Sequence, residues 1–144
     1  MDANRLKIES QILQQYFPKR HAFVDIDTQK AYVDVGIQTN SKNVYRLRVK
    51  IPKDYPNSVP DVLVSHPTGL KTQQGRLLSE LGATHDMHIL GSENGMIRIC
   101  HFKSSDWIPT QTTIYKVILK ARVWLEGYEW HLRTGLPIDR FVKS

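Results

Sequence analysis

The sequence predicts an α+β domain in which two terminal helices pack against one face of a four-stranded antiparallel sheet. Three observations carry this prediction. Apolar residues recur at helical spacing at both ends of the chain, and they alternate with polar residues between positions 21 and 65. The 144 residues, 40% of them hydrophobic, are also enough for one core without disulfides. We therefore expect a single domain over residues 1–144.

The N-terminal segment predicts an amphipathic helix over residues 3–16. Leu6, Leu13 and Tyr16 fall on one stripe of such a helix, and Ile12 lies beside it. Pro18 then ends the helix, because its nitrogen cannot donate the next backbone hydrogen bond. This stripe is expected to face the sheet.

Alternating apolar and polar residues predict four strands, in the segments HAFVDID, AYVDVGIQT, NVYRLRVKI and DVLVS. The third segment is the clearest, since Tyr45, Leu47 and Val49 point to one face while arginine and lysine side chains point to the other. Short polar turns separate the first three strands, which favours an antiparallel meander with one buried face. The proline-rich stretch 52–60 reads as an extended connection.

The remaining sequence divides into an irregular part and a long helix. Residues 66–99 are expected to be irregular, with a turn or two of helix in GRLLSELG. From Thr112 onward apolar residues recur at helical spacing, and Gly135 and Pro137 end that helix. The helix would cover the sheet next to the N-terminal one.

Composition excludes several classes of function. The net charge of +6 comes from basic residues that are scattered, so a nucleic-acid groove is not expected, although a basic face toward an acidic protein stays open. No apolar run reaches the roughly 20 residues that span a bilayer. The polar N-terminus does not resemble a signal peptide, and one cysteine allows no internal disulfide. We expect a cytoplasmic protein with no membrane partner.

Two stretches resemble the ubiquitin-conjugating (E2) family. YRLRVKIPKDYPNSVPDVLV is similar to that family's third strand, proline-rich turn and fourth strand. NGMIRICHFKSSDWIPTQTTIYKVIL is similar to its active-site stretch, in which Asn-Gly precedes the acceptor cysteine and Trp-x-Pro follows it. With the N-terminal helix, the resemblance covers most of the chain and leaves residues 66–87 as an insertion. It implies the UBC-like fold, with the cysteine on an active-site loop before the long C-terminal helix.

The resemblance also implies an enzyme. Cys100 would carry the C-terminus of a protein as a thioester and pass it to a target nucleophile, because only a thiolate suits both steps. The C-terminal stretch WLEGYEWHLRTGLPID looks like the bacterial E2-like proteins of conjugation and antiphage (CBASS) operons. The carried protein would then be a ubiquitin-like modifier or the CBASS cyclic-oligonucleotide synthase. The chain has no Gly-rich nucleotide loop, so either a separate E1-like enzyme would supply activation or the carboxyl group would arrive already activated.

The expected catalytic residues are Cys100, His88 and His101. His88 matches the family's histidine, which holds the active-site loop, and His101 directly follows the nucleophile. The family's His-Pro-Asn triplet is replaced by His-Ile-Leu, so Leu90 stands where an asparagine would support the oxyanion. Asn94, backbone N–H groups of the loop and His88 are the candidate replacements.

We expect no cofactor and no metal. His85 and His88 suggest a metal, but the sequence offers neither a second cysteine nor an acidic residue at ligand spacing. The alternative to an enzyme is a non-catalytic protein-binding module of the same fold, in which Cys100 is buried. A cysteine hydrolase would need a histidine and an orienting residue that the sequence does not identify.

Overall fold

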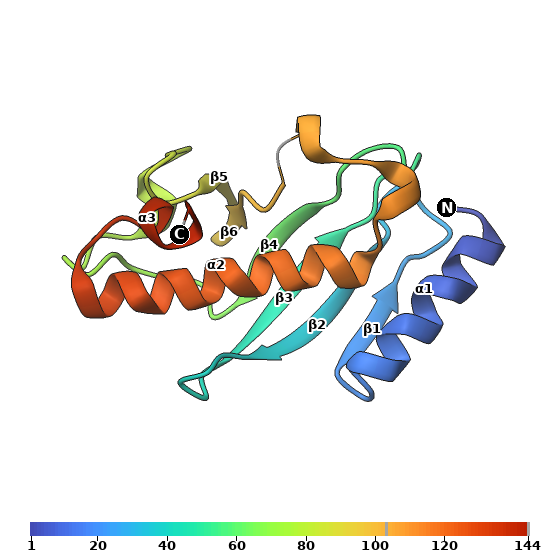
Figure 1. The fold of residues 1–144 in the computed structure, drawn as a ribbon, viewed down its shortest axis with the longest axis horizontal. Coiled ribbons are helices and arrows are strands. Elements are labelled where there is room, and N and C mark those ends of the chain that lie inside the picture. The colour runs from blue at the N-terminus through green and yellow to red at the C-terminus, as the bar shows by residue number, and fades with distance from the viewer. Residues whose placement is uncertain (103, 144) are drawn as a thin grey trace.

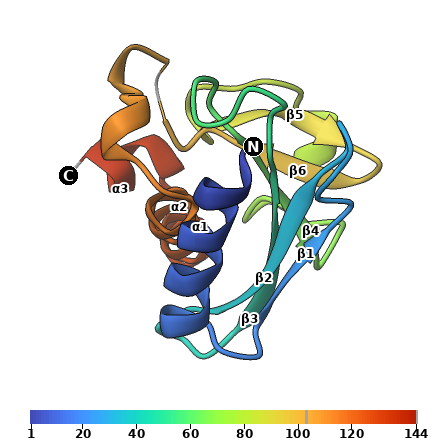
Figure 2. The same cartoon turned by 90° about the vertical axis from the view of Figure 1, so that its right-hand side faces the viewer.

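A six-stranded antiparallel sheet forms one layer of the molecule, and helices cover one of its faces (Figures 1 and 2). The computed structural model describes residues 1–102 and 104–143. The strand order is β1-β2-β3-β4-β6-β5. The strands are β1 (His21–Val24), β2 (Tyr32–Gln38), β3 (Val44–Lys50), β4 (Asp61–His66), β5 (Ile89–Glu93) and β6 (Met96–Ile99). The helices are α1 (Ala3–Tyr16), α2 (Ile114–Thr134) and α3 (Ile138–Lys143), with short 3-10 turns η1 (Leu78–Glu80), η2 (Ser104–Asp106) and η3 (Pro109–Gln111).

The N-terminal helix α1 has the predicted bounds, but the side chains that it buries differ from those predicted. The side chain of Asp2 caps the helix by accepting a hydrogen bond of 2.8 Å from the backbone N–H of Arg5. Leu13 is fully buried, as expected, but the other fully buried residue is Glu9. Tyr16 is exposed and stacks on Tyr115 of α2 with ring centroids 4.1 Å apart. The apolar stripe is therefore shorter than predicted, and a charged residue completes it.

The central strands have the one-sided burial that their alternation predicts. Val33 pairs with Val49 and Val35 with Leu47 across β2 and β3, and all four side chains are buried. On the opposite face Asp34 lies across from Arg48, and its carboxylate accepts two hydrogen bonds from that guanidinium. One face of the sheet thus packs under the helices and the other meets solvent.

The sheet has two strands more than the sequence analysis expected. Residues 89–99, expected to be irregular, form a hairpin whose second strand, β6, pairs with β4. Asn94 and Gly95 make its two-residue turn with positive φ angles of 52° and 80°, which is the Asn-Gly turn that suits the twist of antiparallel strands. The hairpin extends the sheet past β4 and carries the chain to Cys100.

The C-terminal part was expected to be one long helix and contains a second, short one. Thr113 caps α2 by accepting a hydrogen bond of 3.1 Å from the N–H of Lys116, and Gly135 ends it with a φ of 76°. The chain then reverses and forms α3, which packs against α2 (Figure 1). None of the helices in the described part of the chain is long and apolar enough to cross a membrane.

Polar side chains of α2 hold the irregular segment between β4 and β5. The indole N–H of Trp124 donates to the Met87 carbonyl at 3.0 Å, and the Tyr128 hydroxyl donates to the Lys71 carbonyl at 2.7 Å. The segment is thus tied to the helix at both ends. Trp124 and Tyr128 are both buried as well as hydrogen-bonded.

Candidate functional site

Cys100 directly follows β6, at the point where the chain leaves the sheet. Its backbone N–H donates a hydrogen bond of 2.8 Å to the carbonyl of His88, the residue just before β5. The residue is partly exposed and lines a surface pocket. Because a thiolate must be reachable to attack a carbonyl, this position meets the first requirement for the predicted nucleophile.

His88 holds the chain at the base of the β5–β6 hairpin. Its φ is +51°, in the left-handed region that non-glycine residues adopt at a cost of about 1 kcal/mol or more. Two backbone hydrogen bonds fix this conformation, since its N–H donates to the His85 carbonyl at 3.1 Å and its carbonyl accepts from Cys100. The main chain of His88 thus connects the turn before β5 to the chain at Cys100, and its expected role as a catalytic residue stays a prediction.

His101 lies beside Cys100 and is mostly buried. Its imidazole lines the Cys100 pocket and also a second hollow on the other side, formed with the proline-rich turn. Burial lowers the pKa of His101, although a hydrogen bond with the Ile99 carbonyl opposes the effect. A neutral imidazole at physiological pH is able to accept a proton. Thus all three predicted catalytic residues, Cys100, His88 and His101, line one pocket.

Aromatic side chains fix the loop that follows. The indole N–H of Trp107 donates to the Pro56 carbonyl at 2.8 Å, and its ring meets Phe102 edge-on at 5.3 Å. The ammonium group of Lys120 lies 5.3 Å from the centre of the Phe102 ring and brings a positive charge to the Cys100 pocket. Trp107 thus anchors the loop to the proline-rich turn.

The structure shows where the groups lie that the sequence offers as donors to an oxyanion at Cys100. Leu90 is the extra residue of a β-bulge between Ile89 and Gly91, which turns its side chain outward to 42% exposure. It lines the second hollow, and Asn94 sits at the hairpin turn, at the other end of β6 from Cys100. The imidazole of His88 is turned to Asp139. For an acyl transfer at Cys100, this arrangement would leave backbone N–H groups of the loop as the oxyanion donors.

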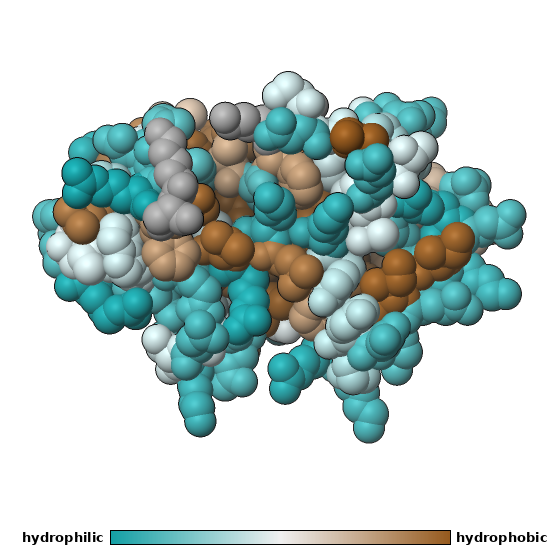
Figure 3. All heavy atoms as spheres, in the orientation of Figure 1, coloured by the Kyte–Doolittle hydropathy of each residue, from teal (hydrophilic) through white to brown (hydrophobic). Residues whose placement is uncertain are grey.

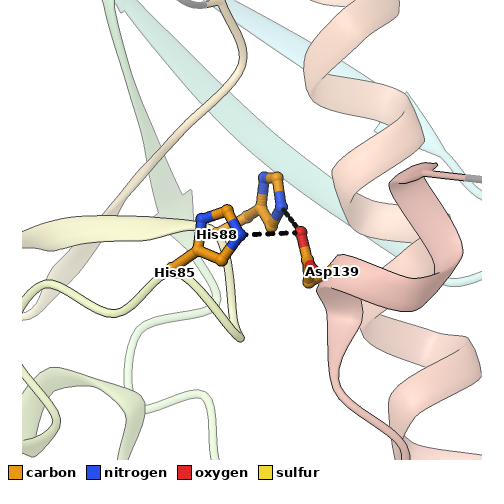
Figure 4. Close-up of side chains that lie close together, drawn as sticks. All are labelled: His85, His88 and Asp139. Atoms are coloured by element: carbon orange, nitrogen blue, oxygen red, sulfur yellow. Dashed lines mark hydrogen bonds and ion pairs between the residues drawn. The ribbon is translucent and has the colours of Figure 1, made fainter.

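A second group of side chains lies close together: His85, His88 and Asp139 (Figure 4). Nε2 of His88 lies 2.5 Å from Oδ1 of Asp139, and Nε2 of His85 lies 3.3 Å from the same oxygen. His85 and His88 also line the pocket of Cys100. The sequence analysis found no acidic partner for the two histidines. Asp139, 51 positions after His88, is such a partner.

The packing of α3 on α2 places Asp139 beside His85 and His88. Ile138 is fully buried, and Gly127 of α2 gives the space for it, since a β-carbon on Gly127 would lie 3.2 Å from Ile138 and 2.9 Å from Phe141. The backbone N–H of Asp139 donates to the Asp86 carbonyl at 2.9 Å. Trp130 of α2 packs on Phe141 of α3.

Comparison with known proteins concerns the first two thirds of the chain. The family model of the RWD domain matches residues 5–97, from α1 into β6. No curated protein and no solved structure matches the chain. The matched part ends before Cys100, so the chemistry of the pocket rests on the residues described above.

Proposed function

The chain belongs to the RWD domain family, which has the UBC-like fold, and on that premise we propose that it is an E2-like acyl transferase with Cys100 as nucleophile. One observation carries the proposal: the single thiol of the chain lines a pocket together with His88 and His101. A cysteine with only a packing role would be more stable if it were fully buried, and Cys100 is not among the buried core residues that the structure describes. The half-exposed position of Cys100 suits a carrier.

The reaction has two steps. The Cys100 thiolate attacks the carbonyl carbon of an activated C-terminal carboxyl group, a thioester bond forms, and the activating group leaves with its electron pair. A target amine then attacks the thioester, an amide forms, and the Cys100 thiolate leaves. His101, whose pKa is lowered by burial, accepts the proton that the amine loses. His88 acts as a positioning residue through its hydrogen bond to the Cys100 N–H.

The acyl donor is the C-terminus of another protein. We propose a ubiquitin-like modifier or a CBASS cyclic-oligonucleotide synthase, in a bacterial antiphage setting, as the resemblance of the sequence suggests. A separate activating enzyme forms the acyl adenylate or thioester from which Cys100 takes the chain. The acceptor is a nucleophile on a target protein, with a lysine amine as the simplest choice.

Intact-mass spectrometry tests the transfer. A ubiquitin-like modifier and a CBASS cyclic-oligonucleotide synthase, each prepared as a C-terminal alkyl thioester, are incubated separately with the chain. We expect a thiol-sensitive adduct with wild type, a thiol-resistant ester with Cys100→Ser, and no adduct with Cys100→Ala. His66→Ala, at an exposed position on β4, is the control and should form the adduct normally. Equal adduct formation by Cys100→Ala, or none by wild type with either donor, contradicts the proposal.

A non-catalytic protein-binding module is the second candidate. RWD domains usually have that role, and one surface of this chain favours it. Leu119 and Val123, one helical turn apart on α2, are 40% and 43% exposed, and apolar side chains gather over α2 in Figure 3. A binding module predicts that Cys100→Ala keeps partner binding and that Val123→Asp loses it. Co-purification with the proteins encoded by neighbouring genes measures this binding.

A further inference from the structure

We propose that His85, His88 and Asp139 form a binding site for a divalent transition metal, with Zn²⁺ as the best-suited ion. The proposal rests on the geometry of these side chains and does not depend on acyl transfer by Cys100. Each residue offers one ligand atom, and the three atoms lie within 4.8 Å of one another. Figure 4 shows both imidazoles pointing at the same carboxylate oxygen.

The distances are close to those of a metal centre. Ligand atoms that surround Zn²⁺ tetrahedrally, at about 2.0–2.1 Å from the ion, are separated from each other by roughly 3.3–3.5 Å. Nε2 of His85 is 3.3 Å from Oδ1 of Asp139, which is already at that separation. Nε2 of His88 is 2.5 Å from the oxygen, so about one ångström of movement by this imidazole would admit the ion.

A simpler role for Asp139 is to orient His88 by a hydrogen bond. One histidine is enough for that role, yet His85 aims its Nε2 at the same oxygen although its side chain is 71% exposed. An exposed imidazole is well hydrated without a protein partner, whereas two neutral imidazoles and a carboxylate around one point are the usual ligands of zinc. The convergence of the second histidine therefore favours a metal.

Backbone hydrogen bonds also hold the three ligands in place. The N–H of His88 donates to the His85 carbonyl at 3.1 Å, which fixes the two histidines in one turn. The N–H of Asp139 donates to the carbonyl of Asp86, a residue of that same turn, at 2.9 Å. Ligands positioned in this way lose little freedom when an ion binds, which favours affinity.

The chemistry of the set also selects the class of ion. Mg²⁺ and Ca²⁺ take oxygen ligands almost exclusively, so two nitrogen donors disfavour them. Three protein ligands leave a fourth position of a tetrahedral zinc ion for water or for a group of a substrate. His85 and His88 also line the Cys100 pocket, so the proposed site borders that pocket.

Metal titration tests the site. The chain, stripped of metal with a chelator, is titrated at neutral pH with Co²⁺, followed by its visible absorption, and with Zn²⁺ in competition with a chromogenic chelator. We expect one ion per chain and the spectrum of tetrahedral cobalt. His85→Ala, His88→Ala and Asp139→Ala should each weaken binding by at least about 100-fold. His66→Ala and Asp27→Asn, both at exposed positions away from the cluster, are matched controls and should bind normally.

Two further measurements make the result decisive. Circular dichroism should show that His85→Ala, the most exposed ligand, folds as wild type, so that its loss of binding reports the ligand itself. Cys100→Ser should keep the metal while losing the thioester, which separates this site from the proposed acyl transfer. Absence of zinc binding by wild type, normal binding by His85→Ala, or loss of binding in Cys100→Ser overturns the proposal.

Discussion

Glu9 shows what a single residue contributes to this fold. Its carboxylate is fully buried and joins three parts of the chain: Arg5 in the same helix at 2.9 Å, the Tyr55 hydroxyl of the proline-rich turn, and the backbone N–H of Ile114 at 3.0 Å. Arg5 in turn donates to the Thr112 carbonyl at 2.6 Å. A buried carboxylate with this many donors is compensated, and it fixes α1 to the start of α2.

Replacing Glu9 by alanine should therefore destabilise the protein strongly. The change leaves the Arg5 guanidinium, the Tyr55 hydroxyl and the Ile114 N–H without their shared acceptor, which costs about 3 kcal/mol or more in the free energy of unfolding. Urea denaturation measures this. Glu80→Ala, at an exposed position, is the control and should change stability by less than about 0.5 kcal/mol. A similarly small effect for Glu9→Ala would show that the network contributes little.

Residues of this kind mark the limit of what the sequence shows. Glu9 falls on the stripe of Leu6 and Leu13, and the pattern of apolar residues gives no partner for it. Its partners Tyr55 and Ile114 are brought by the tertiary fold. Asp139 is the same case, because only the docking of α3 places it beside His85 and His88. The proposal of Cys100 as a nucleophile, by contrast, comes from a signal that is local in the sequence around this residue.

At the scale of elements, the length of each helix or strand determined whether its hydrophobic periodicity could be recognised in the sequence. The long helix α2 and the seven-residue strands β2 and β3 repeat their pattern often enough to be identified. The strands β5 and β6, with five and four residues, do not, and the bulge at Leu90 interrupts the alternation further. Their Asn-Gly turn was the available signal for a hairpin. The helix α3, with six residues, is too short to show a period.

Gly127 controls the position of α3, and Gly127→Ala should displace it. The new methyl group would lie 2.9 Å from a ring carbon of Phe141 and 3.2 Å from Ile138, which is closer than side chains pack. Alanine favours the helix α2 by about 1 kcal/mol, but overpacking against α3 costs about 1–3 kcal/mol. We expect faster hydrogen exchange over residues 138–142 with unchanged helicity of α2.

Metal affinity gives a second readout of the same variant. If α3 moves, Asp139 leaves His85 and His88, and Zn²⁺ binding should weaken by about 10-fold or more. Arg133→Ala, at an exposed position of α2, is the matched control and should alter neither exchange nor binding. Unchanged exchange over α3 in Gly127→Ala would mean that the two helices adjust without separating.

At the scale of the whole molecule, two hydrogen bonds between a buried carboxylate and a tyrosine hydroxyl hold the helices in place. One connects α1 to the proline-rich turn, and the other connects α2 to the sheet. Glu9 accepts from Tyr55, and Glu129 of α2 accepts from Tyr45 of β3 at 2.8 Å. Burial raises the pKa of both tyrosines, and the hydrogen bond to the carboxylate raises it further. Burial opposes ionisation of Glu129, but hydrogen bonds from Asn43 and Tyr45 outweigh it and lower its pKa. Folding thus favours the neutral phenol of both tyrosines.

The whole protein should therefore lose stability in alkaline solution. A group whose pKa is raised by folding contributes stability that is complete below its unfolded pKa, near 10 for tyrosine, and is lost as the pH rises toward the folded value. Above about pH 10 the free energy of unfolding should fall by about 1.4 kcal/mol per pH unit for each of Tyr45 and Tyr55.

Urea denaturation at several pH values measures this slope in wild type, Tyr45→Phe and Tyr55→Phe. Each substitution should make the slope shallower by one tyrosine's share, and the double variant by both, since the two networks are separate. Lysine ionisation is common to all four proteins and cancels in the comparison. Parallel curves for wild type and both variants would show that the carboxylate–tyrosine pairs do not link folding to pH.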